Sequence, residues 1–282
     1  MMLGLGNKPG SWQIRGQQLG AALDARATST PNDADWRWAD LAVLVKRSEP
    51  RFGPDARAAG VPIVWDALDC WRQPTDNGCT EAASRKILQA HQQAIKPALT
   101  IGATQAQAEA AGGVYLPHHS WPGLEPTSPR ERVTTVAYQG NAAYLGNWLA
   151  RVSLACGARG WQFVVNPRDL RDADILVAFR DGSWDGWMCR EWKSGVKLVN
   201  ALAAGRPIIT QISAAAREIT AAPVVLCDEG VTLDAALDMA APLSMRQQVF
   251  EHCVAHAGAY RLPAVAARYR EILATMRTAC PA

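Results

Sequence analysis

The sequence has 282 residues, of which 49% are hydrophobic and 20% charged, and its formal net charge is +3. This composition supplies enough apolar material for a buried core and excludes an intrinsically disordered chain. The mildly basic charge permits a polyanionic partner but does not require one, since the sequence contains no long run of Lys and Arg.

The cysteines and the hydropathy pattern indicate the compartment. Seven cysteines are scattered along the chain and contain no CxxC pair. This spacing favours neither a zinc ribbon nor a disulfide framework, so reduced thiols in a cytoplasmic protein are expected. Residues 1–12 hold no apolar stretch typical of a signal peptide. No segment approaches the roughly 18–20 apolar residues that cross a bilayer, so no membrane span is expected.

Strand-length apolar runs alternate with helical patterns in the first half of the chain. The expected strands are residues 41–45, 61–65, 98–101 and 114–116. The expected helices are residues 14–23, 80–95 and 104–111. Thr104 and Gln107 have capping-box spacing, and the helix that they begin ends at two glycines. Fully apolar strands that alternate with helices predict a parallel sheet covered on both faces.

Residues 117–132 interrupt this alternation, because four prolines there exclude a continuous helix or central strand. Strands are then expected at residues 133–138, 162–165, 175–179, 207–210 and 224–226. Helices are expected at residues 144–156, 194–204 and 213–219, followed by two C-terminal helices. The last of these carries an apolar stripe formed by Val265, Tyr269, Ile272, Leu273 and Met276.

The pattern therefore predicts an α/β protein with two facing Rossmann-like domains. The first covers residues 1–117, the second covers residues 133–282 with its C-terminal helices, and a Pro-rich hinge over residues 118–132 joins them. Two such domains leave a cleft between them, which is a common place for a ligand.

The loop before the first expected helix carries Ser11, Trp12 and Arg15. In this architecture, ligands bind at loops that follow the carboxyl ends of parallel strands. Arg15 in the first helical turn is unfavourable for the helix dipole unless an anion lies there. We therefore expect these residues on the acceptor or phosphate side of the cleft, with a solvated arginine as the alternative.

Three residues are candidates for catalysis at the cleft. Asp66 directly follows the strand 61–65, Asp69 lies one turn later, and His118 begins the hinge. A carboxylate at the end of a parallel strand can act as a general base or hold a sugar hydroxyl, whereas its alternative role is to cap a helix. A histidine in the hinge suits a base at neutral pH, and a structural role is equally open.

The segment after the strand 175–179 carries the densest set of candidate ligand-binding residues. Arg180 follows that strand, and Lys193 and Lys197 have i, i+4 spacing at the amino end of a nearly apolar helix. Two cations there oppose the helix dipole unless a dianion neutralises them, which predicts phosphate binding. Surface lysines are the alternative. Glu218 lies in the next short helix, where it either accepts hydrogen bonds from ribose hydroxyls or faces solvent.

This stretch, KSGVKLVNALAAGRPIIT followed by AAAREI, resembles the nucleotide-sugar-binding half of GT-B-type glycosyltransferases. VAYQGNAAYLG (residues 136–146) resembles the opening strand and glycine-containing loop of that half, and VPIVWDALDCW resembles an acceptor-side strand. The resemblance implies that Gly140, Asn141, Arg180, Lys193, Lys197 and Glu218 bind the donor. Thr210 stands where the second glutamate of the common E-x7-E motif would lie, so the resemblance leaves the stereochemistry open.

No metal constellation stands out in the sequence. The two Asp-Ala-Asp triplets, at residues 33–35 and 172–174, are short enough to arise by chance, and His252 and His256 lack a third ligand at zinc spacing. We therefore expect sugar transfer from a nucleotide-sugar to a hydroxyl acceptor, with neither metal nor cofactor.

The acceptor stays open at this stage. DNA carrying a hydroxymethylated base is one alternative, with Lys46, Arg47, Arg51 and Arg72 lining the first domain's side of the cleft. For the function itself, the alternatives are a nucleotide-sugar 2-epimerase and a non-catalytic nucleotide-binding module.

Overall fold

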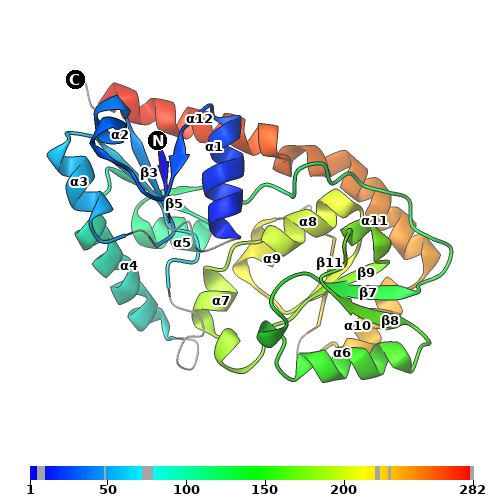
Figure 1. Ribbon diagram of the computed structural model, residues 1–282. Coiled ribbons are helices and arrows are strands. Elements are labelled where there is room, and N and C mark those ends of the chain that lie inside the picture. The colour runs from blue at the N-terminus through cyan, green and yellow to red at the C-terminus, as the bar shows by residue number, and fades with distance from the viewer. Residues whose placement is uncertain (5–9, 48, 72–78, 220–222, 228–229, 280–282) are drawn as a thin grey trace.

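The computed structural model describes residues 1–4, 10–47, 49–71, 79–219, 223–227 and 230–279. Within these residues the chain forms two parallel sheets, one in each half of the molecule (Figure 1). The first has six strands in the order β2-β1-β3-β4-β5-β6, and the second has five in the order β11-β10-β9-β7-β8. The predicted α/β class with two Rossmann-like units is confirmed.

The N-terminal part of the chain builds the first sheet. Its strands are β1 (Met2–Leu3), β2 (Ala27–Thr28), β3 (Ala42–Val45), β4 (Ile63–Asp66), β5 (Leu99–Gly102) and β6 (Val114–Tyr115). Its helices are η1 (Trp12–Gln18), α1 (Leu19–Ala22), α2 (Asp33–Trp38), α3 (Phe52–Ala58), α4 (Glu81–Ile95) and α5 (Gln105–Ala111).

The second part of the chain builds the other sheet and its helices. The strands are β7 (Thr135–Tyr138), β8 (Gln162–Val165), β9 (Ile175–Ala178), β10 (Ile208–Thr210) and β11 (Val224–Leu226). The α-helices are α6 (Trp148–Gly157), α7 (Trp187–Glu191), α8 (Val196–Ala204), α9 (Ala214–Glu218), α10 (Leu233–Ala240), α11 (Leu243–His256) and α12 (Leu262–Ala279). Short 3-10 turns are η3 (Ala142–Tyr144), η4 (Leu170–Asp172), η5 (Gly182–Trp184) and η6 (Ala257–Tyr260).

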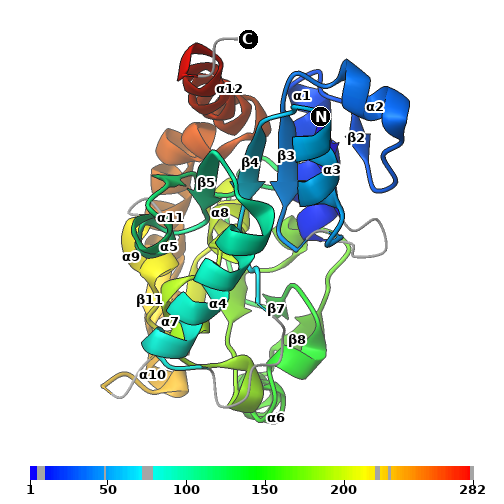
Figure 2. The same cartoon turned by 90° about the vertical axis from the view of Figure 1, so that its left-hand side faces the viewer.

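Both faces of the first sheet are buried, as its continuous apolar strands predict. Leu44 and Ile63 enter one apolar cluster with Leu88 of α4, whereas Val43 and Val64 enter another on the opposite face. Alternate residues of a strand point to opposite faces, so each strand supplies both clusters. Figure 2 shows the corresponding helices on the two sides of this sheet, with α12 on one and α4 on the other.

The first helix begins differently from the expected regular helix. Residues Trp12–Gln18 form a π-helix that continues into α1. The Trp12 ring is buried against Gly16, where an added Cβ would lie 2.0 Å from the Trp12 Cε3 atom. A glycine is therefore required at position 16 for this tryptophan to pack into the core.

The C-terminal region has three helices within the described residues, where the sequence predicted two. The last of them, α12, was expected in the second domain, but it packs on the first sheet (Figure 1). Val265, Ala266 and Tyr269 are buried in the apolar cluster that contains Met2 and Val43. The predicted apolar stripe is therefore correct, and its partner is the N-terminal half. The division of the chain at residues 118–132 stays a prediction.

Removal of the Tyr269 hydroxyl tests how α12 docks. Tyr269 is buried, and its hydroxyl donates to Asp66 Oδ2 over 3.3 Å. Tyr269→Phe should lower the free energy of unfolding by about 1–2 kcal/mol, because the buried carboxylate loses a donor. Chemical denaturation measures this, with Tyr260→Phe as the control that leaves the partners of Asp66 intact. Equal stability of the two variants would contradict the arrangement.

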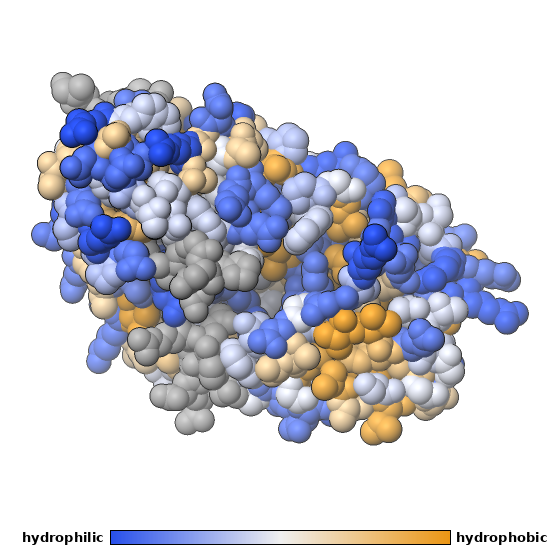
Figure 3. Space-filling model, in the orientation of Figure 1, coloured by the Kyte–Doolittle hydropathy of each residue, from blue (hydrophilic) through white to orange (hydrophobic). Residues whose placement is uncertain are grey.

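The face of the molecule in the orientation of Figure 1 is mostly polar. The face seen in Figure 3 is largely hydrophilic, and hydrophobic residues gather over the second sheet and α6. Among the described residues, no helix is both long and apolar enough to cross a bilayer.

Candidate functional site

A cavity of about 380 Å³ lies between the two halves of the molecule, and both halves supply its walls. From the first half come Ser11, Ile14, Lys46, Asp69 and His118. From the second half come Gly140, Tyr144, Arg180, Lys193, Lys197 and Ser213. This confirms that a ligand-sized space exists where the two sheets face one another.

The amino end of α8 forms one wall of the cavity. Ser194, Gly195, Val196 and Lys197 line it. The N-cap residue, Gly195, offers no side chain to the first amides of the helix, and among the described residues only the amide of Ser194, just before the helix, donates to a side chain at this end, Asp69 Oδ1 over 3.4 Å. An added Cβ on Gly195 would lie 2.3 Å from the Ile219 Cδ1 atom, so glycine allows this turn to pack against α9. The uncapped amides and the positive end of the helix dipole favour an anion at this position.

Lys197 reaches across this helix end to Tyr138. Its Nζ donates to the Tyr138 hydroxyl over 2.9 Å and lies 4.1 Å from the centroid of that ring. Gly140 has a φ of +136°, and an added Cβ there would lie 3.4 Å from Lys197 Nζ. Burial, together with the charges of Arg180 and Lys193, lowers the pKa of Lys197 well below its usual value. An anion in the cavity would relieve this penalty on the ammonium.

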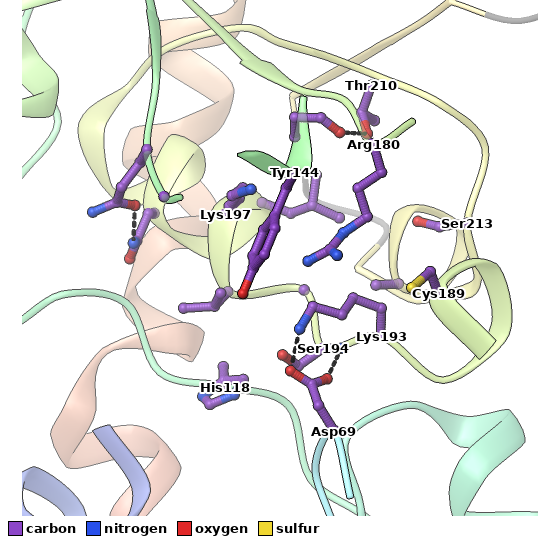
Figure 4. A pocket seen from close by; sticks show the side chains of 18 of the residues that line it. Asp69, His118, Tyr144, Arg180, Cys189, Lys193, Ser194, Lys197, Thr210 and Ser213 are labelled. Atoms are coloured by element: carbon purple, nitrogen blue, oxygen red, sulfur yellow. Dashed lines mark hydrogen bonds and ion pairs between the residues drawn. The ribbon is translucent and has the colours of Figure 1, made fainter. Parts of the chain in front are cut away.

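Arg180 provides a further cation on the same side. Its guanidinium lies 4.7 Å from the centroid of the Tyr144 ring, and its Nη1 donates to the Trp184 carbonyl over 3.3 Å. The Tyr144 ring packs in turn on Trp184, with centroids 4.4 Å apart. In Figure 4, Lys197 and Arg180 lie on either side of Tyr144. The arginine is therefore held by aromatic packing, and it is free to contact an anion with its remaining donors.

An ion pair between Lys193 and Asp69 crosses the cavity, as Figure 4 shows. Burial alone would raise the pKa of Asp69, but the charges of Lys193 and Lys46 outweigh it and hold this pKa well below its usual range. Burial and the charges of Arg180 and Lys46 lower the pKa of Lys193 to about 8, although Asp69 opposes this shift. Asp69 is thus ionised at neutral pH.

His118 lies on the first half's side of the cavity with only 3% of its surface exposed. Its Nδ1 atom is buried and has no hydrogen-bond partner among the described residues. Burial, assisted by the charges of Arg15 and His119, lowers the pKa of His118 well below its usual value. The imidazole is therefore neutral at physiological pH.

Three predicted residues of the first half lie away from the cavity. Asp66 is fully buried, its Oδ2 is 3.5 Å from Arg15 Nε, and burial raises the pKa of its carboxyl. Arg15 also donates to the Leu116 carbonyl over 2.6 Å, and Trp12 packs in the apolar cluster of the first sheet. The charge of Arg15 is thus paired inside the protein, which explains its position in a first helical turn without an external anion.

Two predicted donor-binding residues also have structural roles. Glu218 Oε2 accepts from the Gln105 amide over 2.9 Å, so it caps the start of α5 in the other half of the molecule. Asn141 Oδ1 accepts from the Ala143 amide over 3.1 Å and begins η3. Neither residue lines the cavity, whereas Gly140, Arg180, Lys193 and Lys197 all do.

Sequence reasoning missed Tyr144 and Asn200, which both line the cavity. Asn200 is buried, accepts from the Trp121 amide and donates to the Gln139 side chain, each over 2.8 Å. A single amide in the otherwise apolar helix 198–204 was the signal that could have identified it. Tyr144 gave no such signal, because its role depends on the position of Arg180.

One carboxylate of each Asp-Ala-Asp triplet is held by contacts within the fold. Asp35 forms a capping box with Asn32, and Asp174 accepts from the amides of Thr134 and Thr135. In the part of the chain that the structure describes, no three His, Cys, Asp or Glu side chains are grouped so that they could hold a metal ion.

Comparisons with known proteins identify the fold. No protein-family model matches the sequence, and a search of curated proteins found no match. Among solved structures, AviGT4, a glycosyltransferase involved in avilamycin A biosynthesis, matches with a TM-score of 0.58 and 13% identity over 99% of both chains. A trehalose-6-phosphate protein from E. coli, solved with UDP-2-fluoro glucose bound, matches with a TM-score of 0.52 and 11% identity over 91% of this chain and 82% of that one.

The GtfA/B complex gives a third match, with a TM-score of 0.53 and 11% identity over 85% of this chain. The present chain spans 58% of the length of that protein. The similarity to all three extends over both parallel sheets, which agrees with the resemblance seen in the sequence. The chain therefore has the fold of GT-B-type glycosyltransferases.

Proposed function

We propose that this chain is a glycosyltransferase that moves a sugar from a nucleotide-sugar donor to a hydroxyl acceptor. The observation that carries the proposal is the gathering of Arg180, Lys193 and Lys197 around the uncapped amino end of α8 in one cavity. Cations and helix amides together bind phosphate groups. The shared fold, and the UDP-sugar held by one of the similar structures, support the same class of donor.

The reaction breaks the bond between the sugar C1 atom and the donor phosphate oxygen, and it forms a bond from C1 to the acceptor oxygen. Negative charge develops on the departing nucleoside diphosphate. Lys197 and Arg180 stabilise that charge, so the reaction requires no metal ion or other cofactor in this proposal. The neutral imidazole of His118 accepts the acceptor hydroxyl proton.

A ligand screen followed by a donor assay tests the proposal. Nucleoside diphosphates and nucleotide-sugars are added to the protein, and the melting temperature is measured, because a ligand that binds the native state raises it. The best nucleotide-sugar is then incubated with the protein and EDTA, and release of nucleoside diphosphate is followed. We expect a rise in melting temperature and slow donor hydrolysis. Binding without any hydrolysis or transfer would indicate a non-catalytic module, and loss of turnover in EDTA would refute metal independence.

The lowered pKa of Lys193 makes donor affinity depend on pH. A diphosphate favours the ammonium form, so binding raises this pKa from about 8 and takes up a proton. As pH rises through 8 the free protein loses that ammonium, and affinity for a nucleoside diphosphate should fall by about three- to tenfold between pH 7 and 9. Calorimetry in two buffers measures the affinity and the proton uptake.

Lys193→Arg is the control for this dependence, because a guanidinium stays charged throughout the range. The variant should show a flatter profile and less proton uptake. An affinity that is constant or rises from pH 7 to 9 in the wild-type protein would contradict the placement of Lys193 at the diphosphate.

A further inference from the structure

Among the described residues of the first half, Lys46 is the cation that lines the cavity. It directly follows β3 and adopts the left-handed conformation, with a φ of +61°, which residues other than glycine rarely do. Its amide donates to the Asp66 carbonyl and its carbonyl accepts from Trp65 Nε1, each over 2.7 Å. These two bonds fix the unusual backbone, as is common for residues at functional sites.

The cavity holds more positive than negative side chains. Among its described residues, Arg190 pairs with Asp185 over 2.7 Å and Lys193 pairs with Asp69. No carboxylate is recorded in an ion pair with the three remaining cations of the described cavity, which are Lys46, Arg180 and Lys197. The diphosphate of a nucleotide-sugar carries two negative charges. Arg180 and Lys197 at the α8 end match it. Lys46 stays on the other wall, where it shares the single carboxylate of Asp69 with Lys193.

Lys46 belongs to the acceptor's side of the cavity. It comes from the same half as His118, whose buried Nδ1 atom has no partner in the described structure. The charge of Lys46 also acts on Lys193 and contributes to its lowered pKa, so the two ammonium groups repel each other in the absence of a ligand. An anion beside Lys46 would remove this repulsion.

We propose that the acceptor carries a phosphate or carboxylate group and that Lys46 binds this group in the first half of the cavity. The proposal rests on the proposed glycosyltransferase function, which assigns the second half of the cavity to the donor. It makes Lys46 a residue that determines specificity: it selects an anionic acceptor over a neutral one.

The test measures melting temperature in the presence of a saturating nucleoside diphosphate, so that the donor cations are occupied. The probes are inorganic phosphate, glucose 6-phosphate, glucuronate and glucose, compared at equal ionic strength. In the wild-type protein at least one anionic probe should raise the melting temperature, and glucose should not. Lys46→Met should lower the affinity for that probe about tenfold or more, the scale of a lost charge-assisted hydrogen bond. Its affinity for the nucleoside diphosphate should stay within about twofold of the wild-type value.

Lys96→Met is the matched control. Lys96 is also left-handed, with a φ of +52°, but it is exposed at the end of α4 and does not line the cavity. This variant should bind every probe as the wild type does. The comparison separates the effect of losing the charge of Lys46 from the effect of replacing a lysine with left-handed backbone conformation.

Four results would overturn the proposal. If no anionic probe exceeds glucose while nucleotide still binds, the acceptor site is neutral and the proposed function stands. If Lys46→Met weakens the nucleoside diphosphate equally, Lys46 belongs to the donor site. Retardation of duplex DNA that depends on Lys46, without any effect on the small probes, would assign it to a nucleic-acid phosphate. If the wild type binds no nucleotide at all, the proposed function fails and this proposal fails with it.

Discussion

Replacement of His118 with glutamine is expected to lower kcat by about 10²-fold or more, the contribution of a positioned general base. Of the three predicted catalytic residues, Asp66 lies away from the cavity and Asp69 is held by Lys193. His118, in contrast, lines the cavity and has a neutral side chain at physiological pH. Affinity for a nucleoside diphosphate should be unchanged, because His118 lies outside the proposed donor contacts.

The pH profile provides an independent readout of the same role. A general base must be unprotonated, and the pKa of His118 lies well below its usual value because of burial and the charges of Arg15 and His119. With saturating donor, kcat should therefore stay level from pH 8 to below 6.5 and fall only at lower pH. His91→Gln is the control, since His91 packs on Trp65 in the first half and does not line the cavity. Full kcat in His118→Gln would contradict the assignment and make Asp69 the candidate base.

Lys197→Met is expected to weaken nucleoside diphosphate binding by about 10–100-fold. The methionine keeps the length of the side chain but removes the charge that lies at the amino end of α8. The folded protein should not lose stability, because burial and neighbouring charges already lower the pKa of this lysine. A drop in affinity at an equal or higher melting temperature is therefore the expected combination.

Calorimetric titration and thermal unfolding of the same samples measure both quantities. Lys86→Met, an exposed lysine on α4, is the control for removal of one positive charge from the protein. If Lys197→Met binds the diphosphate as tightly as Lys86→Met does, the amino end of α8 is not the phosphate site.

The position of the two lysines at the cavity was predictable from the sequence, because both belong to one short segment. The sequence predicted a helix over residues 194–204 with Lys193 and Lys197 near its amino end. The structure begins α8 at Val196, so Lys193 lies in the loop before the helix, and both lysines line the same cavity. The strands were predicted for a similar reason: their continuous apolar runs require burial on both faces. The structure ends β8 and β11 at the predicted residues.

The acceptor side was predicted less well, because it depends on how distant segments meet. Asp66 and Asp69 are three residues apart, and the sequence does not indicate which one faces the cavity. Which one does so depends on two ion pairs: Arg15 pairs with Asp66 inside the core, and Lys193 pairs with Asp69 at the cavity. The contact that Glu218 makes was not predictable for the same reason, since its partner, the Gln105 amide, lies in the other half of the molecule.

The C-terminal helix shows the limit of pattern reasoning most clearly. The apolar stripe on α12 was predicted from its spacing, but a stripe specifies only that the helix is covered, not by which surface. In the structure the first sheet covers it, and Tyr269 contacts Asp66. A helix from the end of the chain therefore completes the core of the N-terminal half.

The central claim is that the amino end of α8 binds the donor diphosphate, and a crystal structure of the protein with its best-binding nucleoside diphosphate tests it most directly. We predict phosphate oxygens within hydrogen-bonding distance of the Val196 and Lys197 amides, of Lys197 Nζ and of the Arg180 guanidinium. A well-ordered nucleotide whose phosphates lie elsewhere, with the α8 end still unliganded, would contradict the account.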